Sequence, residues 1–168
     1  EMFKWLKVGA NISGNYLHNN RIPGANLGST IIGRAVQQRP FDRPYKPNGG
    51  YYTGGTDELL LHNAVQILSE ETSYTDNYRF IGSFWAEAQI IKGLTVRASY
   101  NNDSAYTYDY IYYNQNHPYA ADKGRILDRN RFVMTNTIDL YANYNRKIGE
   151  DFELGAMVGP SFLKTRSR

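Results

Sequence analysis

The chain has 168 residues, of which 41% are hydrophobic and 21% charged, and its formal net charge is +3. It has no cysteine, which excludes disulfide bonds, thiolate metal sites and cysteine nucleophiles. No segment approaches the roughly 20 consecutive apolar residues of a membrane-spanning helix. The small, scattered positive charge forms no basic stripe of the kind that binds nucleic acid.

The first predicted strand covers residues 5–17. Side chains on a strand point alternately to opposite faces, so strict alternation of residue type predicts one apolar and one polar face. The apolar positions are Leu6, Val8, Ala10, Ile12 and Tyr16, and the polar or small ones are Lys7, Gly9, Asn11, Ser13 and Asn15.

Residues 18–73 interrupt this alternation with four prolines and several glycines. A gap of that size is too long for a structureless linker in a compact domain, so we expect a large ordered loop. Within it the sequence predicts a helix over Thr30–Gln38, which ends before Arg39-Pro40. A second helix is predicted over Asp57–Leu68, with Asp57 as its N-cap.

A long β-hairpin is predicted over residues 74–91 and 94–105. In both arms the even positions are mostly aromatic or aliphatic and the odd positions mostly polar. The tight turn at 91–94 contains Gly93, which is free to adopt a positive φ. Each arm runs well past the roughly 5–6 residues of an ordinary strand, and a tilted membrane-spanning strand needs about 9–11 residues.

A second long loop is predicted over residues 106–129, then a strand over 130–146, a short turn over 147–151 and a strand over 152–163. The connections therefore run long, short, long, short. In outer-membrane barrels the short turns are periplasmic and the long loops extracellular, whereas a soluble sandwich has no reason to sort its loops by side. The pattern predicts an all-β fold, an antiparallel up-and-down segment of a transmembrane β-barrel. Five strands cannot close a barrel, so we expect the chain to be a portion of a longer protein.

Three stretches resemble the SusC-like TonB-dependent transporters of the bacterial outer membrane. They are residues 63–68 (Asn-Ala-Val-Gln-Ile-Leu), 75–82 (Thr-Asp-Asn-Tyr-Arg-Phe-Ile-Gly) and 86–94 (Ala-Glu-Ala-Gln-Ile-Ile-Lys-Gly-Leu). In that family a short helical Asn-Pro-x-x-x-Leu segment precedes a Tyr-Arg-hydrophobic-x-Gly strand, and a turn of the Ile-Lys/Pro-Gly-Leu type follows. Ala64 departs from the pattern, because it stands where proline is expected. The resemblance covers essentially the whole chain.

The resemblance implies one part of a 22-stranded barrel, with the plug and the TonB-contacting box outside this sequence. It implies a multi-pass protein of the outer membrane of a Gram-negative bacterium, in contact with lipid, that imports nutrients, most often oligosaccharides and sometimes peptides. The family is driven by TonB and works with a SusD-like lipoprotein that closes over the barrel mouth. It implies no cofactor and no enzymatic activity.

The candidate contacts with substrate or partner are aromatic. Trp85 stands at a polar-face position, where we expect it to pack against the plug or to stack on a sugar. Loop tyrosines are expected to stack on a ligand, to contact the lipoprotein or to pack within the loops, because tyrosine has an apolar body and a polar tip. These are Tyr45, Tyr51, Tyr52, Tyr113 and Tyr119. Tyr100, Tyr106 and Tyr108 continue the even-numbered apolar positions and are expected in the aromatic girdle of a barrel.

Charged residues at the odd-numbered, polar positions of the strands are expected to pair across strands or to line a hydrophilic lumen. They are Arg79, Glu87, Arg97, Arg131 and Asp139. The histidines at 18, 62 and 117 lack the spacing of metal ligands, and we interpret them as structural. Glu87 and Asp103 are a conceivable acid pair for glycoside hydrolysis, but nothing in the sequence would raise the pKa of one of them.

The alternative interpretation is a soluble β-sandwich that binds carbohydrate. The two interpretations differ in where they place one set of side chains, which a barrel exposes to lipid and a sandwich buries in its core. The set is Leu6, Val8, Val96, Ala98, Ile138 and Leu140.

Overall fold

The computed structural model describes residues 5–21, 31–38, 41, 43–52, 54–56, 59–120, 123–149 and 151–168. The chain forms two compact units. We call Glu1–Tyr16, Asn77–Thr107 and Arg131–Arg168 the sheet unit, and Leu17–Asp76 and Tyr108–Asn130 the loop unit. Neither helix in the described part of the chain is long and apolar enough to cross a membrane.

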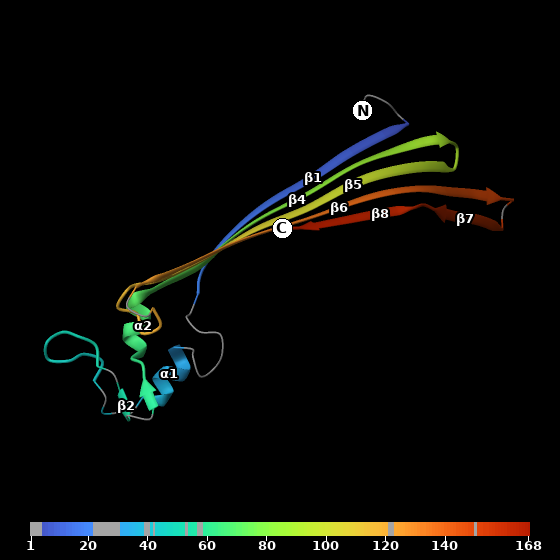
Figure 1. Cartoon of the computed structure of the whole chain (residues 1–168). Helices are drawn as coiled ribbons and strands as arrows, with labels where there is room; N and C mark the ends of the chain where they lie inside the picture. Colours follow the sequence, from blue (N-terminus) through green and yellow to red (C-terminus); the bar gives the residue numbers. More distant parts are fainter. Residues whose placement is uncertain are drawn as a thin grey trace. The chain divides into compact units, whose positions relative to one another are not determined.

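Long strands lie side by side in the sheet unit (Figure 1). The strands are β1 (Leu6–Asn20), β4 (Glu71–Ile91), β5 (Leu94–Tyr113), β6 (Arg125–Ile148), β7 (Phe152–Val158) and β8 (Ser161–Ser167), and the first four also contribute residues to the loop unit. Their order is β1-β4-β5-β6-β7, with β8 also paired to β6. Each long strand therefore pairs with the next one along the chain, and the predicted antiparallel up-and-down barrel segment is confirmed.

The predicted strand over 152–163 is present but interrupted. Val158 of β7 lies opposite Ala142, and Phe162 of β8 lies opposite Ile138, so both pieces share one register along β6. The break falls at residues 159–160, because Pro160 has no N–H to donate to the ladder. Its carbonyl still accepts a hydrogen bond of 3.1 Å from the backbone N–H of Leu140. β7 and β8 therefore act as one strand that reaches Ser167.

The two faces of the sheet differ as the alternation predicts. We call the face of the even-numbered side chains the apolar face and that of the odd-numbered ones the polar face. On the apolar face Val8 is 71%, Phe162 65% and Ile138 52% exposed. All buried apolar side chains of the described residues (Ala64, Ile67 and Ala120) belong to the loop unit. The sheet unit is a single layer in the described chain, so the described residues form no second sheet that would bury Val8 and Ile138 as the sandwich interpretation expects.

The hairpin turn between β4 and β5 depends on Gly93. Its φ is +90°, a conformation that other residues adopt only with strain. Its carbonyl accepts a hydrogen bond of 2.8 Å from the backbone N–H of Asn145 on β6. The sequence-based expectation of a positive φ at this residue is therefore confirmed.

The loop unit contains α1 (Ile31–Gln37), the antiparallel pair β2 (Gly54–Thr56) and β3 (Leu59–Leu61), and α2 (Ala64–Glu70). The predicted helix over Asp57–Leu68 is wrong in its first half, where β3 forms. Asp57 lies outside the described residues, and the N-cap of α2 is Asn63. The side chain of Asn63 accepts hydrogen bonds from the backbone N–H groups of Val65 and Gln66, which starts the helix at Ala64.

The predicted loop over 106–129 is wrong at both ends, because β5 continues to Tyr113 and β6 begins at Arg125. The tyrosines at 106, 108, 110 and 112 keep the period of two, and tyrosine favours strands. Within the loop unit the ring of Tyr74 lies 5.2 Å from that of Tyr110. β1 and β4 likewise extend beyond the predicted 5–17 and 74–91, to Asn20 and from Glu71.

Candidate functional site

Trp85 lies on the polar face of the sheet unit, where the sequence places it. The guanidinium carbon of Arg97 lies 4.3 Å from the centre of the Trp85 ring, in a cation–π contact. Nη1 of Arg97 also lies 3.7 Å from Oε2 of Glu87. An atom placed as Cβ on Gly9 would come within 2.5 Å of the indole, so the ring lies over the backbone of β1. Trp85 is thus covered by Arg97 on one side and packed on Gly9.

The polar face carries a set of side-chain pairs that link neighbouring strands. Arg79 donates to both carboxylate oxygens of Asp103, at 2.9 and 2.7 Å. Asp139 accepts from Asn101 at 3.3 Å and from Ser161 at 2.5 Å. Such pairs are the unit of cross-strand stabilisation.

Both carboxylates of the conceivable acid pair for glycoside hydrolysis are paired with arginines. Glu87 is paired with Arg97, and Asp103 with Arg79. A general acid for glycoside hydrolysis needs a carboxyl group held in its neutral form. An arginine beside each carboxylate is the opposite arrangement, so the geometry does not support this chemistry.

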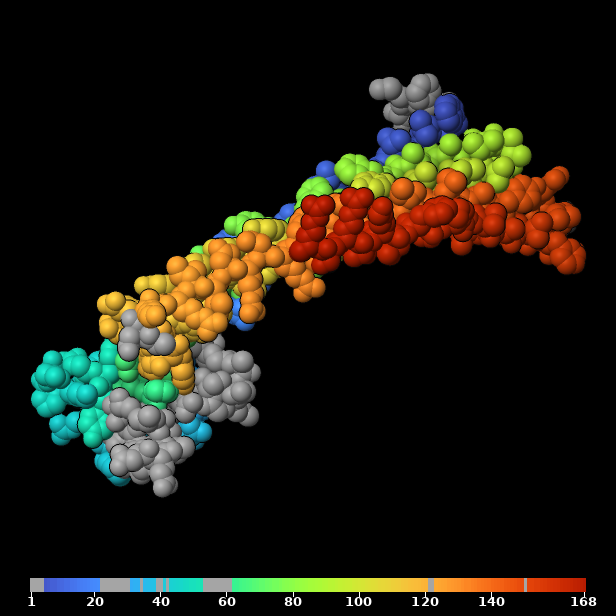
Figure 2. Space-filling view, viewed as in Figure 1, coloured from blue at the N-terminus to red at the C-terminus, as the bar shows by residue number. Residues whose placement is uncertain are grey.

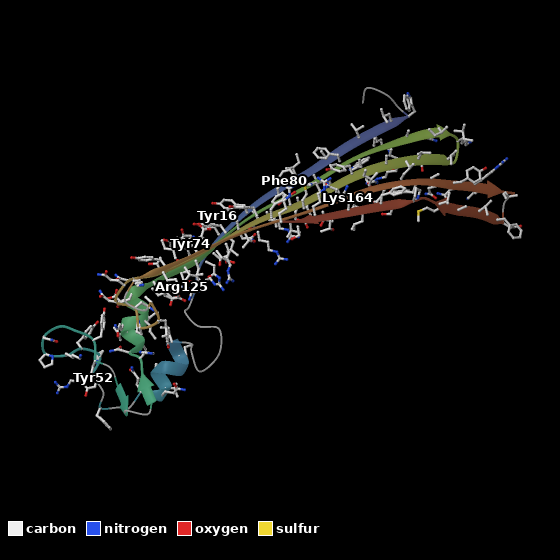
Figure 3. The ribbon with its side chains drawn as sticks, in the orientation of Figure 1. Tyr16, Tyr52, Tyr74, Phe80, Arg125 and Lys164 are labelled. Atoms are coloured by element: carbon white, nitrogen blue, oxygen red, sulfur yellow. The ribbon has the colours of Figure 1, made fainter. Side chains whose placement is uncertain are left out.

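In the loop unit, Tyr45, Tyr51 and Tyr52 lie on a tight turn. The backbone N–H of Lys46 donates to the carbonyl of Gly50 at 2.6 Å, and Tyr45 and Tyr51 form a bridge with ring centres 5.6 Å apart. Tyr45 is 51% and Tyr52 42% exposed. Figure 3 labels Tyr52. The turn therefore presents two tyrosine side chains to the outside.

Asn63 fastens this turn to α2. Its side-chain nitrogen donates to the carbonyls of Pro44 (2.6 Å) and Tyr52 (3.0 Å), while its oxygen caps the helix. The residue is 1% exposed. This buried amide therefore uses both of its N–H donors, and its oxygen accepts two hydrogen bonds. In the sequence Asn63 stands out only as part of a motif, because its amide nitrogen bonds to a loop residue eleven positions away and leaves no local signal.

The rings of Tyr113 and Tyr119 both contact the ring of His117. The His117 ring is 4.5 Å from the centre of the Tyr113 ring and 5.5 Å from that of Tyr119. Tyr119 also contacts His62 edge to face at 4.9 Å. His117 is 3% exposed, and its Nδ1 accepts a hydrogen bond of 3.2 Å from the backbone N–H of Tyr119. Two of the candidate tyrosines thus share one buried histidine.

His117 faces a buried carboxyl group. Its Nε2 lies 3.6 Å from Oε2 of Glu71, and this nitrogen has no hydrogen-bond partner among the described residues. Burial raises the pKa of Glu71 to about 7, against the opposing charge of Arg21, and burial lowers the pKa of His117. Both shifts disfavour charge, so we interpret the pair as two neutral groups rather than as an ion pair. Sequence reasoning missed Glu71 because its partner is 46 residues away.

The structure thus brings five of the six candidate residues into the loop unit, in two groups, and Trp85 into the sheet unit. Asn63 contacts the first group, and Tyr113 and Tyr119 make the second with His117. In the described part of the chain, no three His, Asp or Glu side chains come close enough to hold a metal ion. The loop groups are aromatic, partly exposed and suited to stacking on a ligand or a partner.

Comparison with known proteins finds no matching family model and no matching curated protein. Two solved structures are similar. One, described as the structure of the RagAB peptide transporter, is 20% identical with a TM-score of 0.75, and the match covers 99% of this chain and 20% of that chain. The other, described as the RagAB peptide importer in the "open-open" state, is 21% identical with a TM-score of 0.76, and the match covers 98% and 19%. The chain spans about a fifth of the length of these chains and shares the fold of that part.

Proposed function

We propose that the chain is a wall-and-loop segment of an outer-membrane TonB-dependent transporter, which imports nutrients together with a SusD-like surface lipoprotein. The observation that carries the proposal is the uncovered apolar face of the sheet unit. Val158, Val8 and Phe162 are 76%, 71% and 65% exposed there. An apolar patch of this extent marks an interaction surface.

Lipid is the covering that fits this face. An outer-membrane barrel carries an outward apolar band flanked by aromatic residues, and a polar interior. The sheet unit has the same division, with paired charges such as Arg79 and Asp103 on its polar face. Aromatic side chains on the apolar face, Tyr16, Tyr78 and Tyr106, form contacts with ring centres 4.8 and 6.3 Å apart. Tyr106 is one of the residues that the sequence predicted for an aromatic girdle, and Tyr16 and Tyr78 would extend that girdle.

Both similar structures are described as a peptide transporter or importer. We therefore favour peptides over oligosaccharides as the proposed cargo. The exposed tyrosines at 45 and 52 suit either class, since a tyrosine ring stacks on sugar rings and on peptide side chains alike. On this proposal the loop unit is extracellular and contacts cargo and lipoprotein. TonB would act on parts of the transporter outside this sequence. The segment is assigned no catalytic role.

The sharpest test of the membrane assignment compares two neighbouring residues of β7. Met157 on the polar face is 74% exposed and Val158 on the apolar face is 76% exposed. In a water-soluble protein, Met157→Arg and Val158→Arg would have similar, small effects. At mid-membrane an outward arginine costs about 2–4 kcal/mol, so Val158→Arg in the full-length protein should sharply reduce heat-resistant folded barrel in the outer-membrane fraction.

Met157→Arg is the matched control and should insert at near wild-type levels. Equal insertion of the two variants, or a wild-type protein that fractionates as soluble without detergent, would overturn the proposal. The cargo is tested separately, by uptake of labelled peptide mixtures and of oligosaccharides in cells that carry the inserted transporter.

A further inference from the structure

The apolar face contains a cluster of hydrogen-bonded polar side chains, which we call the island. Tyr100 donates to the side-chain oxygen of Asn136 at 2.7 Å, and the side chain of Asn102 donates to the same atom at 2.8 Å. Ser104 in turn donates to the side-chain oxygen of Asn102 at 2.9 Å. All four residues have even numbers on β5 and β6 and therefore belong to the mostly apolar face. No described residue accepts a hydrogen bond from the side-chain nitrogen of Asn136.

Two cations flank this island. In the register of β6 and β8, Lys164 lies opposite Asn136 and Arg166 opposite Met134. Both are exposed, and neither forms an ion pair with any described residue. Figure 2 shows the side chains of β8 uncovered along one edge of the sheet unit, and Figure 3 labels Lys164. Within the residue ranges of the sheet unit, no described even strand position is Asp or Glu, and the even-numbered Asp76 and Asp128 of β4 and β6 belong to the loop unit. The apolar face of the sheet unit is therefore positively charged.

The position of Lys164 along its strand sets its depth. From Phe152, beside the short turn, to Phe162, the described outward residues of β7 and β8 are all apolar. Ten residues rise roughly 33 Å along a strand, which at a tilt of about 40° is about 25 Å, the height of the apolar band of a barrel. Lys164 is the next outward residue, so it would stand in the headgroup layer at the membrane boundary away from the short turns.

An apolar groove of about 620 Å³ adjoins the island on its membrane side. Its apolar lining comes from four strands and includes Val8, Phe84, Ala98, Tyr100 and Ile138. Tyr100 belongs both to the groove and to the island, and Ile138 is one outward position from Asn136. The surface therefore changes over a short distance from a shallow apolar groove to hydroxyl, amide and cationic groups.

We propose that this surface binds a phosphorylated glycolipid of the outer leaflet. Lys164 and Arg166 would bind the phosphate, since basic side chains at the membrane boundary attract anionic lipid headgroups. The amide and hydroxyl groups of the island would hydrogen-bond the sugar, and the groove would hold an acyl chain. This inference rests on the proposed function, because it takes the apolar face to be in lipid and the long loops to be extracellular.

The test uses the full-length transporter, purified in mild detergent, with lipid A and with lipid A whose phosphates have been removed. Native mass spectrometry and the lipid-induced rise in Tm give the affinities. Lys164→Gln combined with Arg166→Gln should weaken binding of lipid A by about thirtyfold. Arg146→Gln is the control, because Arg146 lies on the same face opposite Leu154, near the short turn, and its loss should leave the affinity unchanged.

Equal binding of phosphorylated and dephosphorylated lipid A, or an unchanged affinity in the double variant, would overturn the inference. So would an equal loss of affinity in Arg146→Gln, because the effect would then follow net charge rather than this site. Cell fractionation of the same proteins separates this failure from that of the proposed function. A protein that inserts in the outer membrane but fails to discriminate the two lipids refutes only the lipid site.

Discussion

The indole of Trp85 on β4 lies directly over Gly9 on the neighbouring strand β1, within 2.5 Å of where a Cβ on residue 9 would stand. Gly9→Ala therefore forces the ring or the strand to move. Overpacking of this kind costs about 1–3 kcal/mol. We expect this loss of unfolding free energy in urea titrations of the full-length protein in detergent.

Gly14 on the same strand is the matched control for Gly9. A Cβ there would meet no atom within 4 Å, so Gly14→Ala should be neutral or slightly stabilising. In a Trp85→Leu background the cost of Gly9→Ala should largely disappear. A cost that persists in that background would show that the indole is not its cause.

Asn63 holds two structures through one side chain, and two substitutions separate its roles. Asn63→Asp keeps the acceptor that caps α2 but loses the donors to the carbonyls of Pro44 and Tyr52. Asn63→Ala loses both. An N-cap contributes about 0.5–2 kcal/mol, and each buried carbonyl left unpaired costs about 1–3 kcal/mol.

We expect limited proteolysis to cut residues 43–52 faster in both variants of Asn63. Hydrogen exchange of α2 should speed up only in Asn63→Ala. Faster exchange of the helix in Asn63→Asp would contradict this division of roles.

The buried carboxyl of Glu71 predicts a stability that depends on pH. Its pKa in the folded protein is about 7, above the ordinary value of 4.5, so the folded state keeps a proton that the unfolded chain loses as pH rises through that interval. The stability of the loop unit should therefore fall between about pH 4.5 and pH 7 and stay low above it. Glu71→Gln removes the charge and should raise stability at pH 8 by on the order of 2–3 kcal/mol, with little change at pH 4.

His117 acts in the opposite sense. Burial lowers the pKa of His117 below 6.5, so the unfolded chain takes up a proton on this residue before the folded protein does. The stability of the loop unit should therefore fall as pH falls below 6.5. Tyr113 beside it also has a pKa raised by burial and stays neutral throughout this range. Proteolysis in urea at pH 4, 6 and 8 measures both effects. If the stability of the loop unit stays constant between pH 5 and pH 8, and Glu71→Gln has the same stability over that range, the carboxyl of Glu71 is not held neutral by burial.

The exposed Tyr45 predicts an effect on cargo rather than on folding. Its side chain is 51% exposed on the turn that Asn63 fastens. Tyr45→Ala should lower uptake severalfold, because an aromatic contact contributes about 0.5–1.5 kcal/mol beyond its buried area. Insertion in the outer membrane should not change. Tyr112→Ala is the control, since Tyr112 is also exposed (37%) but lies outside both tyrosine groups. An equal loss of uptake in the two variants would contradict the assignment of Tyr45 as a cargo contact.

Features that depend on near neighbours in the chain could be predicted from the amino-acid sequence. Alternation with a period of two predicted the apolar and polar faces and the parity of Trp85, because a strand turns successive side chains to opposite sides. The position of Gly93 predicted the hairpin, because a tight turn needs a positive φ. Each of these signals lies within a few residues.

The alignment of the strands and the contacts among loop residues depend on the three-dimensional fold. Asn63 caps α2 instead of Asp57, and Glu71 meets His117, through contacts that join distant segments. Asn136 and Lys164 share a row because β6 and β8 pair in one register. Register and burial are set by the summed packing of whole strands, and no local pattern carries that sum.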